Sequence, residues 1–168
     1  MGSAASSETT TAAAGKVGQL RHDPFAMLPF CGYNMGDYFG HWIQIGRMAF
    51  PHNLPKIFYV NWFRKDEDGK FMWPGYTDNV RVLKWVIERV QGTGKYVDTP
   101  IGRLPAEGAL DTTGLDIKPD TLKKLFTVDK ELWLGEVEEM RTYYKIFGTH
   151  LPKELSAELD KIEERLKK

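Results

Sequence analysis

The segment from residue 62 to residue 79 holds the residue types best suited to binding a flat aromatic ligand. Its aromatic side chains and its asparagine are Trp62, Phe63, Phe71, Trp73, Tyr76 and Asn79. Aromatic faces stack on nucleobases, and each stacked base contributes about 1–3 kcal/mol. An asparagine beside them offers both a donor and an acceptor to the edge of a purine. This pattern predicts a site for a planar base.

Local sequence signals indicate how these side chains could meet. Residues 56–63 are rich in β-branched and aromatic types, which predicts a strand, and residues 70–73 predict a short return strand. The charged run 66–69 between them ends in glycine and predicts a turn. A hairpin of this length would bring the rings of Phe63, Phe71 and Tyr76 together.

The same residues also fit a second interpretation, in which they form a small hydrophobic core beneath the hairpin. Aromatic clusters are usually core, and composition alone favours this interpretation. Asn79 would then be the N-cap of the helix that follows. The residue types by themselves leave both interpretations open.

Other motifs supply no further chemistry. The run Gly92 to Lys95 resembles the end of a phosphate loop, but position 89 is arginine and position 96 is tyrosine, which do not fit that motif. The histidines at 22, 41, 52 and 150 lack metal-ligand spacing, and Cys31 has no adjacent activator. We therefore predict no catalytic residue and no metal site in this sequence.

The elements around the aromatic cluster are predicted to be mostly helical. Apolar residues recur at spacings of three and four in 35–45, 83–90, 133–147 and 155–166. Asn34 is the predicted N-cap of the first helix, and Gly92 ends the second. Pro119 begins a short helix through Leu125. Short strands are expected at 95–97 and 101–104.

The composition limits the class of protein. The 168 residues are 42% hydrophobic, which excludes a chain that is disordered throughout. Lys plus Arg and Asp plus Glu both number 23, which argues against binding driven by phosphate neutralisation. No apolar run is long enough to span a bilayer. We therefore expect no nucleic-acid or membrane partner, and a single cysteine fits a reducing, cytoplasmic location.

Residues 1–15 are small, polar and nearly uncharged. Three interpretations stay open for them. The first six residues match the pattern for N-myristoylation, Met-Gly-Ser is common at cloning junctions, and such a loop could order only over a bound ligand.

Four stretches together resemble GTP-dependent phosphoenolpyruvate carboxykinases. They are HDPFAMLPFCGYNMGDYFGHW (22–42), LPKIFYVNWFRKDEDGKFMWPGYTDNVRVLKW (54–85), TPIGRLP (99–105) and LFTVDKELWLGEVEEM (125–140). The resemblance covers nearly the whole chain. It implies a mixed α/β (α+β) fold: the carboxy-terminal part of the family's nucleotide-binding domain, helix-rich toward the carboxy terminus.

The resemblance also implies a division of labour along the chain. Residues 1–21 would be a mobile lid-like loop and 22–168 the rest of the domain, with a guanine pocket at 58–80 and a helical shell at 118–168. The lid residues would be Ser7, Glu8, Thr9, Thr10, Thr11, Ala12, Ala13, Ala14 and Gly15. The nucleotide-binding residues would be Phe63, Phe71, Tyr76, Thr77, Asp78 and Asn79. Tyr76 and Thr77 depart from the phenylalanine and glycine common at those positions.

The implied reaction converts oxaloacetate and GTP to phosphoenolpyruvate, GDP and carbon dioxide, in gluconeogenesis. It implies Mn²⁺ or Mg²⁺, GTP or GDP, and oxaloacetate or phosphoenolpyruvate as ligands of a monomeric enzyme. The family's phosphate loop, metal ligands and oxaloacetate-binding arginines would lie upstream of the lid. We therefore expect this chain not to catalyse alone. The alternative is a non-catalytic fragment that binds a nucleotide or a protein.

Overall fold

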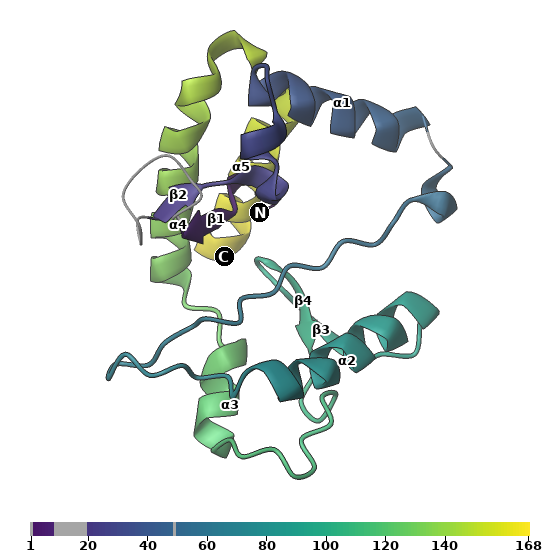
Figure 1. Ribbon diagram of the computed structural model, residues 1–168, viewed down its shortest axis with the longest axis vertical. Coiled ribbons are helices and arrows are strands. Elements are labelled where there is room, and N and C mark those ends of the chain that lie inside the picture. The colour runs from purple at the N-terminus through teal and green to yellow at the C-terminus, as the bar shows by residue number, and fades with distance from the viewer. Residues whose placement is uncertain (1, 9–19, 49) are drawn as a thin grey trace. The chain divides into compact units, whose positions relative to one another are not determined.

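The computed structural model describes residues 2–8, 20–48 and 50–168 (Figure 1). The chain divides into two compact units. One comprises residues 1–55 and 131–168, and the other comprises residues 56–130. As expected, the fold is mixed α/β and rich in helix, and the described residues form two small antiparallel sheets. None of the described helices is both long enough and apolar enough to cross a bilayer.

The first unit is built mainly from three α-helices. They are α1 (Met35–Met48), α4 (Lys130–Tyr144) and α5 (Lys153–Lys167), with a 3-10 segment, η6 (Lys145–His150), after α4. Arg141 on α4 pairs with Asp160 and Glu163 on α5, which places these two helices side by side. The buried side chains of α4 and α5 include Val137, Met140, Leu159 and Leu166. This part of the chain is therefore rich in helix, as the expected fold class implies.

The start of α1 packs closely against η6. Asn34 Oδ1 accepts a hydrogen bond from Gly36 N at 2.8 Å, so the predicted N-cap is confirmed. A Cβ on Gly36 would lie 2.6 Å from the carbonyl oxygen of His150, which only glycine avoids. The rings of Phe39 and Phe147 meet edge to face at 5.4 Å. Trp42 and Ile45, predicted on the same buried face, are 41% and 47% exposed.

The remaining elements of the first unit lie near the amino terminus. They are η1 (Gly2–Ala4), β1 (Ser6–Glu8), β2 (Leu20–His22), η2 (Pro24–Ala26), η3 (Leu28–Phe30) and η4 (Pro51–Asn53). Strands β1 and β2 pair antiparallel, with Ser6 opposite His22 and Glu8 opposite Leu20. Of the predicted lid, Ser7 and Glu8 therefore lie in a paired strand, and Thr9 to Gly15 lie outside the described residues.

The second unit holds α2 (Asn79–Gln91), α3 (Pro119–Phe126), β3 (Tyr96–Thr99), β4 (Gly102–Pro105) and the short η5 (Tyr76–Asp78). Strands β3 and β4 lie close to the two predicted short strands, and they pair antiparallel as a tight hairpin. Gly92 has φ 85° and ends α2, which confirms the predicted stop. The run Gly92 to Lys95 is thus a helix end: Thr93 N and Gly94 N both donate to the Glu88 carbonyl.

The predicted strand at 56–63 is wrong. Residues 56–61 have no regular secondary structure, residues 62–63 form a turn, and the segment has no strand partner within the described chain. Side chains hold it instead: Lys56 Nζ donates to the Val90 carbonyl at the end of α2, and Phe58 meets Trp85 edge to face at 6.1 Å. The return strand at 70–73 is reduced to a single bridge between Lys65 and Phe71. A strand needs a ladder partner as well as β-forming residues, and the sequence pattern reports only the second.

The predicted inward face of α2 is also wrong in large part. Leu83, Ile87 and Val90 are 52%, 56% and 51% exposed. The residue that α2 buries is Trp85, whose Nε1 donates to the carbonyl oxygen of Lys95 at 2.8 Å.

Candidate nucleotide-base site

Two of the three predicted stacking rings meet. The centroids of Phe63 and Phe71 are 6.0 Å apart, with an interplanar angle of 63°. Both side chains are open to solvent, at 72% and 53% exposure. An exposed aromatic pair keeps ring surface available to a ligand, whereas a core pair does not. Phe63 and Phe71 therefore fit the binding interpretation better than the core interpretation.

A short turn holds these two rings in place. The backbone N–H of Phe63 donates to Asn61 Oδ1 at 2.9 Å. Asp66 Oδ1 accepts from the backbone N–H groups of Asp68 and Lys70, and Gly69 has φ 77°. The charged run at 66–69 thus forms the predicted turn because an aspartate side chain satisfies the N–H groups at its tip.

The third ring, Tyr76, stands apart from this pair. Its side chain is 96% exposed, and it makes no ring contact within the described part of the chain. Tyr76 lies in η5 directly after Gly75, whose φ of 110° and ψ of −147° favour glycine strongly. The convergence of all three rings on one base therefore stays a prediction.

The two residues that follow Tyr76 lie on the turn into α2. Thr77 is exposed, and Asp78 N donates to the Gly75 carbonyl at 3.0 Å. The Asp78 carboxylate accepts from Arg81 Nε at 2.9 Å, and Arg81 also reaches the carbonyl of Asp111. These contacts hold the backbone of the turn in a defined position at the start of α2.

The same cluster contains Asp111, which also contacts Lys84. The backbone N–H of Thr113 donates to its carboxylate, and this bond, together with Lys84, holds the pKa of Asp111 below its usual range. Asp111 is therefore a structural anion here, and it pairs with Arg81 and Lys84 of α2.

Asn79 does not act as the predicted N-cap. It is the first residue of α2, and its Oδ1 accepts a hydrogen bond from Trp73 Nε1 at 2.8 Å. Trp73 itself is buried, at 6% exposure, and Met72 beside it is also buried. The sequence placed Trp73 in the cluster but gave it no role. The available sequence signal was a tryptophan six residues before an asparagine. If such a tryptophan is buried, its indole N–H needs an acceptor.

A lysine that sequence reasoning left out also belongs to the site. Lys65 Nζ lies 5.3 Å from the centre of the Phe71 ring. Such a contact between a cation and a ring face is favourable. Lys65 also pairs with Phe71 through the single backbone bridge of the turn, which holds the lysine next to the ring.

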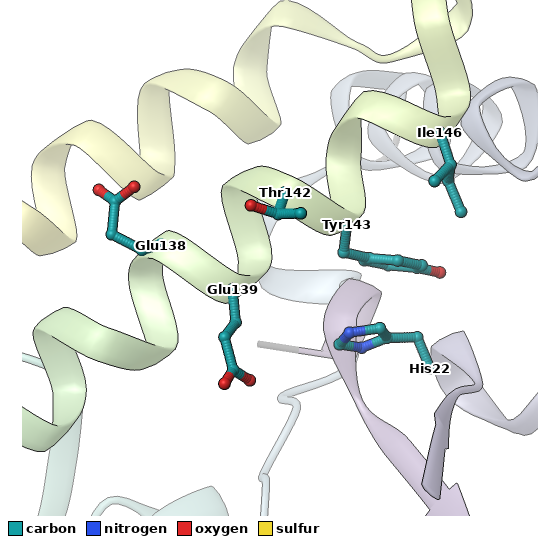
Figure 2. Close-up of a pocket in the computed structure, with 6 residues that line it drawn as sticks. All are labelled: His22, Glu138, Glu139, Thr142, Tyr143 and Ile146. Atoms are coloured by element: carbon teal, nitrogen blue, oxygen red, sulfur yellow. The ribbon is translucent and has the colours of Figure 1, made fainter.

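A separate hollow lies in the first unit (Figure 2). Its lining residues are His22, Glu138, Glu139, Thr142, Tyr143 and Ile146. The His22 ring stacks on the Tyr143 ring at 3.9 Å, as Figure 2 shows, and its Nδ1 lies 3.1 Å from the carbonyl of Ala4. These contacts anchor the β1–β2 pair on α4, and the hollow contains none of the predicted nucleotide-binding residues.

A second anchor lies beside the first. Ser3 Oγ and Tyr144 Oη are 2.7 Å apart, and both side chains are buried. The segment before β1 and the last residue of β2 are therefore fixed to neighbouring tyrosines of α4. The described residues offer no candidate metal site: they contain no group of three or more His, Cys, Asp or Glu side chains able to hold an ion.

The family model that matches this chain and the relatives compared with it all name the same protein family. The chain matches the model described as "Phosphoenolpyruvate carboxykinase C-terminal P-loop domain" over residues 1–165. It is 59% identical over 168 residues to the GTP-type phosphoenolpyruvate carboxykinase of Neocallimastix frontalis. It is 54% identical to that of Arthrobacter sp. (strain FB24) and 51% identical to that of Chlamydia muridarum. Each alignment covers 99% of this chain and 27–28% of the relative, so the chain spans just over a quarter of their length.

Proposed function

Because this chain belongs to the phosphoenolpyruvate carboxykinase family, matching its C-terminal P-loop domain, we propose that it forms the guanine-binding part of a GTP-dependent enzyme. That enzyme converts oxaloacetate and GTP to phosphoenolpyruvate, GDP and carbon dioxide. The observation that carries the proposal is the solvent-exposed pair of Phe63 and Phe71, whose ring surface is open to a ligand in the same unit as Asn79.

The role of each residue follows from its chemistry. Phe63 and Phe71 stack on the guanine, and Tyr76 adds a third face when the base is bound. Asn79 meets the edge of the base with its side-chain amide. Thr77 and Asp78 contribute backbone groups of the turn. The phosphates then extend away from these residues toward groups that the rest of the enzyme supplies.

The lid proposal concerns the other unit. Residues Ser7 to Gly15 close over the bound substrates and exclude water, so that the enolate takes up a phosphoryl group and not a proton. Within the proposed lid, Ser7 and Glu8 belong to β1, which pairs with β2, so these two residues form the attached end of the lid.

The enzyme is proposed to need Mn²⁺ or Mg²⁺, which neutralises charge on the transferring phosphoryl group. The described residues of this chain do not fit such an ion, because no cluster of suitable ligands is present among them. No step is therefore assigned to a metal held by this chain. We further propose a cytoplasmic, monomeric enzyme with no nucleic-acid or membrane partner.

The test of the base site is a calorimetric titration of the chain with GDP and with ADP. We expect GDP to bind more tightly. Phe71→Ala removes a stacking face, which should weaken GDP binding about 5- to 150-fold, the equivalent of 1–3 kcal/mol.

The matched control is Phe50→Ala in the first unit. Phe50 is 71% exposed and stacks on His52, so like Phe71 it is an exposed phenylalanine with a ring neighbour. It should leave GDP binding unchanged. Equal affinity for GDP and ADP, or no binding, would favour the alternative of a non-catalytic fragment.

A further inference from the structure

The hydrogen bond between Trp73 and Asn79 fixes which end of the asparagine amide faces the ligand. An indole N–H can only donate, so the atom it meets 2.8 Å away must be the Asn79 oxygen. The amide NH2 group therefore points away from Trp73. It has no hydrogen-bond partner among the described residues, so both of its N–H donors are free for a ligand.

The amide cannot easily turn over. Trp73 is 6% exposed, so a flipped Asn79 would leave a buried indole N–H facing another donor. The backbones on both sides are also held: Asn79 begins α2, and Met72 N donates to the Arg64 carbonyl in the turn. Arg64 in turn donates to the Leu125 carbonyl near the end of α3.

Purine bases differ at the position that such an amide reads. The O6 and N7 atoms of guanine both accept hydrogen bonds, whereas adenine presents an N7 acceptor beside an N6 amino donor. An asparagine that is free to rotate can satisfy adenine by using its oxygen and its nitrogen together. An asparagine with its oxygen turned to Trp73 offers donors, which suit a 6-oxo purine and oppose a 6-amino purine.

We propose that Trp73 is the residue that sets the base specificity of this site, by holding the Asn79 amide in the orientation that selects 6-oxo purines. The proposal rests on the proposed function, since it needs a purine at this site. Trp73 acts through Asn79 and is a positioning residue, without itself contacting the base.

The test compares IDP with ADP, because IDP has the 6-oxo group but lacks the 2-amino group of guanine. For the wild-type chain, we expect IDP to bind at least tenfold more tightly than ADP. In Trp73→Phe the amide is released, and we expect the ratio of the two dissociation constants to fall at least fivefold, with ADP binding more tightly than before.

The matched control is Trp85→Phe. Trp85 is also 6% exposed, lies in the same unit and donates its Nε1 proton over 2.8 Å, but to the carbonyl of Lys95. It should lower stability to a similar degree and leave the ratio between IDP and ADP unchanged. This separates base selection from a general loss of folding.

If Trp73→Phe does not fold, 3-benzothienylalanine at position 73 keeps the size of the ring and removes only the N–H. A folded variant of either kind that keeps the wild-type ratio overturns the role of Trp73 and leaves the proposed function standing. A wild-type chain that binds none of GDP, IDP or ADP overturns both. A wild-type chain that binds IDP and ADP equally overturns the selection but not base binding.

Discussion

Buried aromatic side chains with a polar tip recur in this chain, and most have a partner for that tip. Trp73 donates to Asn79, Trp85 donates to the Lys95 carbonyl, and Tyr144 is bonded to Ser3. These bonds satisfy polar groups whose burial would otherwise be costly, by about 1–3 kcal/mol each. They also link residues that no sequence motif connects.

Tyr143 gives a prediction at the level of a single group. Burial raises its pKa to about 12, and the negative charges that Tyr144 and Asp23 can carry add to this effect. Below pH 10 the phenol is neutral in the folded and the unfolded chain alike. Between pH 10 and about 12 it ionises only in the unfolded chain, so unfolding becomes easier as the pH rises.

The measurement is a series of urea denaturations from pH 9 to pH 12. The wild-type midpoint should fall more steeply above pH 10 than that of Tyr143→Phe, which has no phenol to ionise at this position. Phenylalanine keeps the ring that stacks on His22. Parallel curves for the two proteins would contradict the assignment.

At the scale of elements, the turn before α2 decides where Tyr76, Thr77 and Asp78 lie. Gly75 has φ 110° and nothing lies within 4 Å of a Cβ built on it, so the strain of an alanine there would come from the backbone alone. Such conformations cost non-glycine residues about 1–3 kcal/mol.

We therefore expect Gly75→Ala to lower stability and to weaken GDP binding, because the turn must relax to a different shape. Gly92→Ala is the matched control: it lies at the other end of α2, with φ 85° and equally open space around it. It should lower stability, as seen in thermal unfolding, with GDP affinity retained. Loss of affinity in both variants would mean that helix stability and not turn shape controls binding.

The helices and their ends could be predicted from the sequence because their signals are local. Asn34, Gly92 and Pro119 mark helix ends as expected, since capping and backbone conformation depend on neighbouring residues. The segment 56–63 could not be predicted, because a strand depends on a partner elsewhere. Asn79 was placed at the right helix end but given the wrong bond, since only the fold brings Trp73 to it.

At the scale of the whole molecule, each unit has its own buried residues, but the second unit leaves much apolar surface open. Along α2, the exposed apolar residues are Val80, Leu83, Ile87 and Val90. Residues 56–61 also expose apolar side chains, namely Ile57, Tyr59 and Val60. Large exposed apolar patches are typical of surfaces that associate.

We expect the 168-residue chain by itself to self-associate at micromolar concentration. The double change Leu83→Gln with Ile87→Gln should shift it toward the monomer in sedimentation velocity. Ile146→Gln removes an apolar side chain of the first unit that is still more exposed, at 68% against 52% for Leu83 and 56% for Ile87, and should have little effect. A wild-type chain that stays monomeric at high concentration would contradict this expectation.

A guanine base is proposed to bind against the residues between Phe63 and Asn79. The most direct measurement is a two-dimensional NMR titration of the isotopically labelled chain with GDP, using ADP as the reference. We predict that the amides shifted by GDP cluster in residues 61–79 and include the indole N–H of Trp73. Shifts confined to the hollow around His22 and Tyr143, or the same shifts with ADP as with GDP, would contradict the account.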